Sequence, residues 1–123
     1  MATGFVQRFK GKIAASVLYF VNGKRGLTAL AGGAQAGTAL RWGLNVVSTV
    51  SSGNDSVQLP VSTGSGGVVI VKNAAASNSL QIFGVNTDTI NGISSGTGVS
   101  LAHDLVRVFI DVESGKWSSL LGA

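Results

Sequence analysis

The chain of 123 residues contains no cysteine, so it can form neither a disulfide framework nor a thiolate metal site. It has a single histidine, His103, and only five acidic residues, which leaves few groups for acid–base chemistry. No stretch approaches the ~20 apolar residues of a membrane-spanning helix, and this excludes an integral membrane protein. Stability must come from packing, and we expect the protein to act by shape and contact.

Charge is scarce as well, at 11% of residues against about 25% in an average soluble domain. We therefore expect partners to cover part of the surface. All five acidic residues follow position 41, whereas six basic residues precede position 42. The basic residues of this first part are Arg8, Lys10, Lys12, Lys24, Arg25 and Arg41. The basic character thus belongs to one end of the chain.

Glycine is abundant, with 18 residues against a single proline, and the apolar residues are rich in valine and alanine. This composition favours strands and tight turns over helices. Short apolar runs between turn-forming clusters predict strands at 44–50, 57–59, 68–71, 79–83, 99–102, 105–112 and 116–120. We predict an all-β fold, an antiparallel jelly-roll-like sandwich over residues 42–123, preceded by a basic apolar arm and connector over residues 1–41.

Two of these predicted strands differ in pattern. The continuous run Val68–Val71 is typical of a strand covered on both faces. In the run 105–112, valine and isoleucine alternate with Arg107, Phe109 and Asp111. We interpret these mixed side chains as facing outward, which is typical of a strand near an edge or a subunit contact.

The arm itself allows two local structures. Phe5, Phe9, Ile13 and Val17 follow a four-residue spacing that is typical of a helix. Alternatively, residues 17–21 form a strand that turns at Asn-Gly, a strong hairpin signal. We predict an extended or partly helical arm. A secretory signal is disfavoured, because two basic residues at positions 24 and 25 separate the apolar run from the cleavage-like Ala-Leu-Ala.

The residues that could carry chemistry do not assemble into a site. His103 and Asp104 are neighbours that would point to opposite faces of a strand, so no nucleophilic triad is predicted. Asp111 and Glu113 could share one strand face and hold a cation or pair with Lys116, but a metal site needs more oxygen ligands. We predict no enzyme activity, no metal and no cofactor.

Two further motifs have simpler interpretations than ligand binding. Asp88 lies in NTDTING, which lacks the remaining positions of a calcium loop, so we predict a turn-forming residue. The glycine-rich segment Gly64–Gly67 resembles a phosphate-binding loop but lacks the lysine and the helix that such loops require. Nucleotide binding is not predicted.

The basic apolar arm is compatible with three kinds of partner. Its charges and its aromatic residues Phe5, Phe9, Tyr19 and Phe20 could bind nucleic acid by phosphate attraction and stacking. The same residues suit an acidic groove on another protein, and we favour this interpretation because the charges are few. Glycines in the segment disfavour a membrane-surface helix.

Several motifs between residues 27 and 117 together resemble a known family, the small β-rich virion proteins of tailed bacteriophages. In that family an N-x-G turn, a strand ending in proline, a G-D-x-I-N-G segment and a terminal tryptophan follow one another. Here Ala75 stands where glycine is common, and Gly84 lies near a common proline position. The matching stretches are ALAGGAQAGTAL (29–40), NVVSTV (45–50), VVIVKNAAASNSLQIFG (68–84), DTING (88–92) and GKW (115–117).

The resemblance implies a role on the virion, as a capsid decoration (cement) protein that binds the major capsid protein and stabilises the head. The alternative is a trimeric fibre or tail-tip module that presents loops such as Thr87–Gly98 to a host receptor. We expect a homotrimer or a dimer on the outer capsid surface, made in the host cytoplasm, without membrane or nucleic-acid binding. The expected capsid-binding residues are Phe5, Arg8, Phe9, Lys10, Lys12, Phe20, Lys24 and Arg25.

Overall fold

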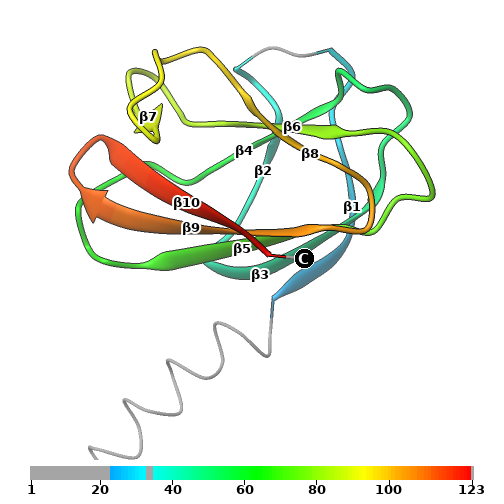
Figure 1. The fold of residues 1–123 in the computed structure, drawn as a ribbon, viewed down its shortest axis with the longest axis horizontal. Helices are drawn as coiled ribbons and strands as arrows, with labels where there is room; N and C mark the ends of the chain where they lie inside the picture. Colours follow the sequence, from blue (N-terminus) through cyan, green and yellow to red (C-terminus); the bar gives the residue numbers. More distant parts are fainter. Residues whose placement is uncertain (1–22, 33–34, 123) are drawn as a thin grey trace, which may run out of the picture.

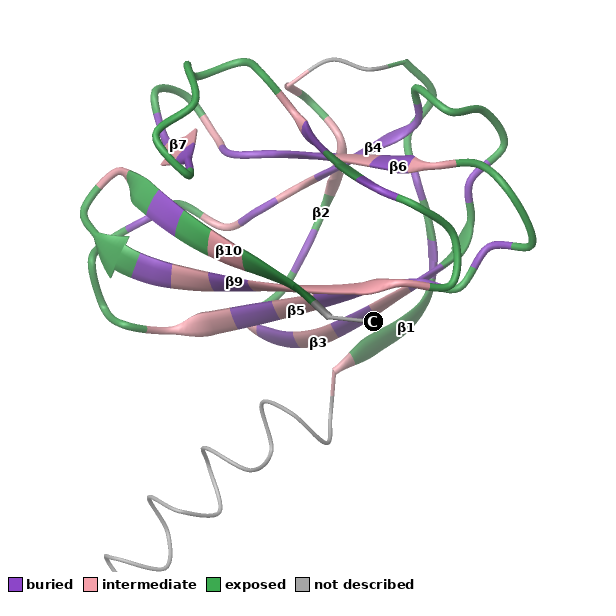
Figure 2. Cartoon of the chain, in the orientation of Figure 1, coloured by how far each residue is buried: buried purple, intermediate pink, exposed green. Residues whose placement is uncertain are grey.

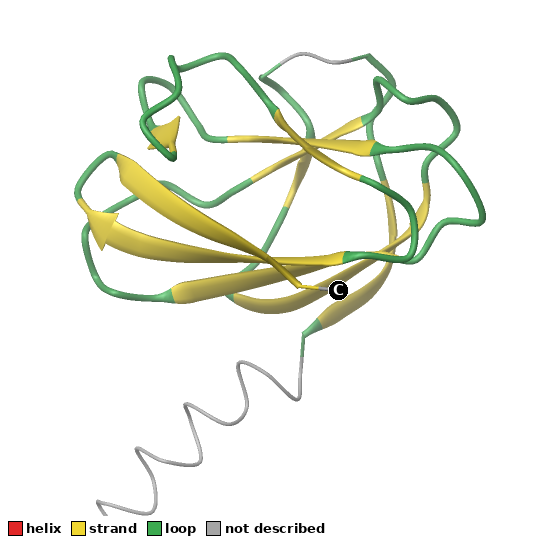
Figure 3. Ribbon diagram, viewed as in Figure 1, coloured by secondary structure: helices red, strands yellow, loops and turns green. Residues whose placement is uncertain are grey.

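The computed structural model describes residues 23–32 and 35–122, and these residues contain strands and turns but no helix (Figure 3). The predicted all-β character is confirmed for this part of the chain. The strands are β1 (Lys24–Thr28), β2 (Thr38–Ala39), β3 (Gly43–Thr49), β4 (Ser56–Gln58), β5 (Val68–Asn73), β6 (Leu80–Phe83), β7 (Thr89–Ile90), β8 (Val99–Leu101), β9 (Val106–Glu113) and β10 (Lys116–Gly122).

The strands form two sheets that face each other across the core (Figure 1). One sheet has six strands in the order β1-β3-β5-β9-β10-β7, and the other has four in the order β2-β4-β6-β8. From β1 to β6 the chain crosses to the other sheet after every strand. As a result, β3 lies parallel to both β1 and β5, and β4 lies parallel to both β2 and β6.

This winding makes the fold a β-solenoid of stacked coils, so the prediction of an antiparallel jelly-roll-like sandwich is wrong. Among the described strands, the antiparallel pairs are β8 with β6, β9 with β5 and β10 with β9, so they all involve the last three strands. Parallel neighbours need a crossover connection, and here the strands of the opposite sheet serve as the crossovers. Both architectures use short strands and frequent turns, so the sequence pattern did not separate them.

The core lies between the sheets and consists mainly of aliphatic side chains. In β3, β5 and β9 the buried residues are all odd-numbered, among them the fully buried Val47, Val69 and Phe109. Trp117 is also buried, and its ring lies 5.5 Å from that of Trp42 between centroids. Further buried residues come from the four-stranded sheet and its connections: Val57, Leu59, Leu80, Ile82 and Leu101.

Buried asparagines hold the turns between coils. The Asn45 side chain accepts a hydrogen bond from Arg41 N at 2.9 Å and donates one to Arg41 O at 2.8 Å. Asn73 donates to Leu101 O at 3.0 Å. Because these amides replace the missing backbone partners of the bends, they can be buried without loss of hydrogen bonding.

The predicted strand ranges agree with the structure within a few residues, except that β1, β2 and β7 were not predicted. The predicted orientation of residues 105–112 is wrong, since Phe109 and Asp111 are buried inside and the valines face outward. The strand is not at an edge either, because β9 lies between β5 and β10. Burial of the Phe109 ring removes more apolar area from water than burial of a valine does. The Asp111 carboxylate can lie inside because a loop donates hydrogen bonds to it.

The N-terminal segment is only partly described. The first 22 residues of the predicted arm and connector (1–41), with their helical spacing and the strand before Asn-Gly, lie outside the described residues. The division at residue 41 stays a prediction. On its N-terminal side, Leu27, Ala29 and Leu40 are all buried in the core of the solenoid.

Candidate interaction surface

The outer side of the six-stranded sheet carries neighbouring aliphatic side chains from several strands. Side chains alternate across a strand, so the inward direction of the odd-numbered residues turns the even-numbered ones outward. On β5 the buried Val69 and Val71 thus alternate with the half-buried Val68 and Ile70. No described residue covers the outer face of β5, so the prediction of a strand covered on both faces is wrong for the described part of the chain. Figure 2 shows the alternation along β5 and β9.

Registers place these outward residues side by side across four strands. Leu44 on β3 lies opposite Ile70 on β5, Ile70 lies opposite Val108 on β9, and Val108 lies opposite Leu120 on β10. Directly opposed residues have Cβ atoms only about 5 Å apart, so the four side chains form one row. The neighbouring rows add four more aliphatic residues: Val46, Val68, Val106 and Ile110. We call these eight residues the aliphatic face.

No described segment lies against the aliphatic face, because the four-stranded sheet is on the other side (Figure 1). Leu120 is 66% exposed, and the other seven side chains are half-buried. Contiguous apolar patches of this kind are uncommon on monomers and mark contact sites.

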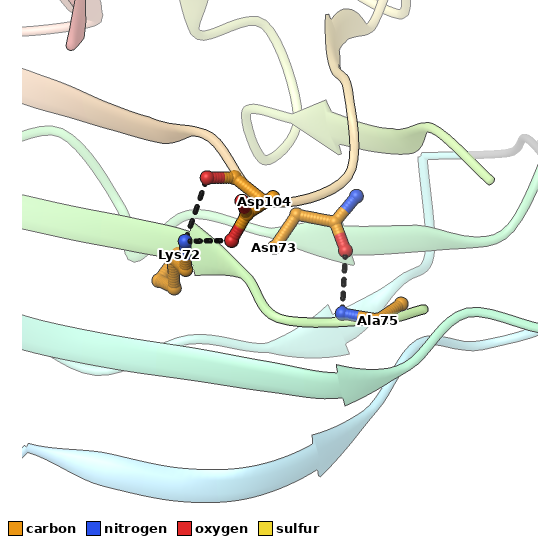
Figure 4. A network of polar contacts seen from close by, with 4 residues as sticks. All are labelled: Lys72, Asn73, Ala75 and Asp104. Atoms are coloured by element: carbon orange, nitrogen blue, oxygen red, sulfur yellow. Dashed lines mark hydrogen bonds and ion pairs between the residues drawn. The ribbon is translucent and has the colours of Figure 1, made fainter. Parts of the chain in front are cut away.

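One rim of this face is formed by an ion pair between Lys72 and Asp104 (Figure 4). The Lys72 ammonium lies 2.8 Å from the Asp104 carboxylate and 2.6 Å from the Asp104 carbonyl oxygen. The hydrogen bond and the positive charge of Lys72 lower the pKa of Asp104. Towards the turn between β9 and β10, Lys116 lies 3.4 Å from Glu113, one of the two arrangements expected for this run.

Lys24 and Arg25, the two expected capsid-binding residues within the described chain, are neighbours on β1. This strand forms one edge of the six-stranded sheet, and both side chains are exposed. Neither has an ion pair or a side-chain hydrogen bond with the residues that the structure describes. The other six expected contact residues lie outside the described part: Phe5, Arg8, Phe9, Lys10, Lys12 and Phe20.

The glycine-rich loop that resembled a phosphate cradle does surround an anion, the carboxylate of Asp111. Backbone N–H groups of Thr63, Gly64 and Ser65 donate to this carboxylate at 2.9, 3.1 and 3.3 Å, and the Ser62 hydroxyl donates to it as well. Burial raises the pKa of Asp111, but the hydrogen bonds from Ser62 and from the loop backbone prevail and lower it. The sequence gives no signal for this pairing, because the loop and the aspartate lie far apart along the chain.

Ser62 connects that loop to two other segments. Its backbone N–H donates to Asp88 at 2.8 Å, and its hydroxyl accepts hydrogen bonds from the N–H groups of Gly115 and Lys116 at 2.9 and 3.1 Å. Asp88 N also donates to Val85 O, as expected for a residue in a turn. Asp88 and Asp111 therefore act as acceptors that fix loops against the sheet.

The remaining candidates do not come together. His103 is exposed, and its neighbour Asp104 pairs with Lys72. Among the described residues there is no group of three or more His, Asp or Glu side chains that could hold a metal ion. None of these residues belongs to a helix long and apolar enough to cross a membrane.

Comparison with protein-family models, curated proteins and solved structures found no match for this chain. The resemblance to phage virion proteins is therefore carried by its sequence motifs alone.

Proposed function

We propose that this chain is a structural protein of a phage virion, a decoration protein that binds the major capsid protein on the outside of the head. The observation that carries the proposal is the exposed pair Lys24 and Arg25 on the β1 edge, which has no acidic partner in the described chain. These two cations are the next basic residues in the sequence after Arg8, Lys10 and Lys12. Unpaired cations at a sheet edge suit an acidic surface on another protein and increase the association rate.

The solenoid also suits a structural role. The buried carboxylates Asp88 and Asp111 accept hydrogen bonds that hold loops in place. The chain can thus serve as a rigid body that lies on a larger assembly. The expected anchors Phe5, Phe9 and Phe20 would bury apolar area, while the cations would form rim pairs that are each worth less than about 1 kcal/mol.

A charge-reversed full-length chain tests this assignment. Lys24→Glu together with Arg25→Glu should weaken binding to undecorated capsids at least about tenfold, and the loss should shrink as salt rises. Arg41→Glu, a charge reversal at an exposed residue outside β1, is the control and should bind within about twofold of the parent chain. Equal effects of both changes would contradict a specific role for β1.

Deleting residues 2–21 tests the predicted anchors in the same assay. We expect the shortened chain to lose most of its capsid binding, because the apolar contacts go with the segment. Undiminished binding would overturn the arm assignment, and circular dichroism would establish that the solenoid is intact.

A fibre or tail-tip module is the second candidate, favoured by one observation. Residues 91–97 form a continuous exposed stretch within the loop Thr87–Gly98 that was expected to contact a receptor. Copy number in purified virions separates the candidates, since hundreds of copies over the shell indicate decoration and a few tens at one vertex indicate a fibre. Absence of the chain from the virion would contradict both.

A further inference from the structure

The guanidinium group of Arg107 on β9 has no carboxylate partner in the described chain. Arg107 is half-buried, its Nη1 donates to the Ser119 hydroxyl at 2.7 Å, and its Nε is enclosed without a hydrogen-bond partner. A charge that is partly removed from water normally has an opposite charge beside it. Arg107 therefore carries a positive charge and donors that the described residues leave unused.

All five acidic side chains of the protein lie within the described residues, and each is held elsewhere. Asp104 pairs with Lys72, and Glu113 pairs with Lys116. Backbone N–H groups of loops donate to the other three carboxylates, which are Asp55, Asp88 and Asp111. The acidic side chains of this chain thus leave the charge of Arg107 without a counter-charge.

The hydroxyl group of Ser119 also has a donor to offer. Its oxygen accepts one hydrogen bond from Asn91 Nδ2 and one from Arg107 Nη1, both at 2.7 Å. A hydroxyl has two acceptor positions and one donor, so only its proton remains for a further partner. The Ser119 backbone N–H donates to Asn91 Oδ1 at 2.7 Å, which fixes the orientation of the amide. The cluster therefore presents N–H and O–H donors beside one positive charge.

We propose that Arg107 and Ser119 bind the carboxylate group of an organic ligand. The guanidinium group and the Ser119 proton provide donors for its two oxygens, and the planar fork of arginine suits a carboxylate. One positive charge balances a carboxylate, whereas a phosphate monoester carries nearly two negative charges near pH 7. Leu121 lies directly opposite Arg107 on β10 and is 54% exposed, so it offers an apolar contact for the carbon atoms next to the carboxylate.

The site is separate from the proposed capsid contact. Strands β3 and β5 lie between β9 and the β1 edge that carries Lys24 and Arg25. Asn91 begins the exposed stretch of residues 91–97, which places the cluster at the surface. Carboxylate binding does not depend on the proposed virion role, and its failure would leave that proposal untouched.

Nuclear magnetic resonance of the full-length chain tests the site, with sodium propionate as the probe. We expect the Arg107 Nε–H and Ser119 amide signals to shift saturably with a dissociation constant of about 1 to 50 mM, because one ion pair and one hydrogen bond give weak binding. Propionamide, the uncharged analogue, and sodium chloride at equal ionic strength should leave both signals in place. No saturable shift with propionate, or an equal shift with chloride, would overturn the inference. Tighter binding of sodium phosphate would also overturn it.

Matched variants assign the binding to these side chains. Arg107→Gln removes the charge and should weaken propionate binding at least about tenfold, measured from the Ser119 amide signal. Arg41→Gln is the control, since Arg41 is exposed and lies outside the strands, and it should bind within about twofold of the parent chain. Parent-like binding by Arg107→Gln would contradict the proposed site.

A second variant covers the case in which Arg107→Gln fails to fold. Ser119→Ala removes the O–H donor and keeps the charge, so it should weaken propionate binding about threefold or more, measured from the Arg107 Nε–H signal. Binding like that of the parent chain would overturn the part assigned to Ser119.

Discussion

At the scale of single residues, the most consequential group is the carboxylate of Asp111. It is fully buried, yet the backbone of residues 63–65 and the hydroxyl of Ser62 surround it with donors. A buried anion is tolerated only with such compensation. The loop between the sheets and the strand β9 are thereby held together.

Replacing Asp111 by asparagine should destabilise the protein by about 2 to 3 kcal/mol, because the charge-assisted hydrogen bonds weaken and an amide N–H₂ faces backbone donors. Urea unfolding measures the loss. Asp104→Asn makes the same chemical change at an exposed residue paired with Lys72, and we expect less than about 1 kcal/mol there. Similar losses at both positions would contradict the role assigned to the buried carboxylate.

The lowered pKa of Asp111 also predicts how stability depends on pH. The unfolded chain takes up this proton near the ordinary value of about 3.9, before the folded chain does, so stability is present above that pH and falls as the pH drops further. Thermal unfolding between pH 6 and pH 2 should show the decline, with a shallower slope in Asp111→Asn. The pKa of Asp104 is lowered as well. Salt screens its exposed ion pair with Lys72, so at high salt the Asp104→Asn variant should keep most of the parent chain's decline in stability with falling pH.

At the scale of elements, the start of β5 lies close to the ring pair of Trp42 and Trp117. A Cβ atom at Gly67, directly before β5, would lie 2.5 Å from the Trp42 ring, which itself stacks on Trp117. Only glycine fits there without moving the ring.

Gly67→Ala should therefore cost about 1 to 3 kcal/mol and alter the near-ultraviolet circular dichroism of the two tryptophans. Gly53→Ala is the matched control, because a Cβ atom there meets nothing within 4 Å. We expect that control to be neutral or slightly stabilising, since alanine restricts the unfolded chain. An unchanged tryptophan signal in Gly67→Ala would show that Trp42 is not held in this position.

At the scale of the whole molecule, the solenoid stacks its coils so that each one buries the next. The first coil contains β1 and β2, which cover one edge of each sheet. Leu27 and Leu40, from the segment predicted to be arm and connector, belong to the core of this coil.

A fragment of residues 42–123 tests whether the domain boundary lies near residue 41. We expect it to be much less stable than the full chain, because loss of Leu27 and Leu40 opens the core, and large-to-small changes at such sites cost about 2 to 5 kcal/mol each. A lower urea midpoint and a smaller slope of unfolding would agree with this expectation. Unfolding like that of the full chain would instead place the boundary near residue 41.

The sequence by itself determined the strand class and most strand positions, because turn residues and apolar runs act locally along the chain. It also contained the residues of the aliphatic face, although their outward direction was not recognised. Tertiary structure decided which strands pair, which side of β9 is inside, and that residues 62–65 bind Asp111. Those outcomes depend on contacts between distant segments, where the volume of Phe109 and the hydrogen bonds to one buried carboxylate outweigh the preference of the β-branched residues for the interior.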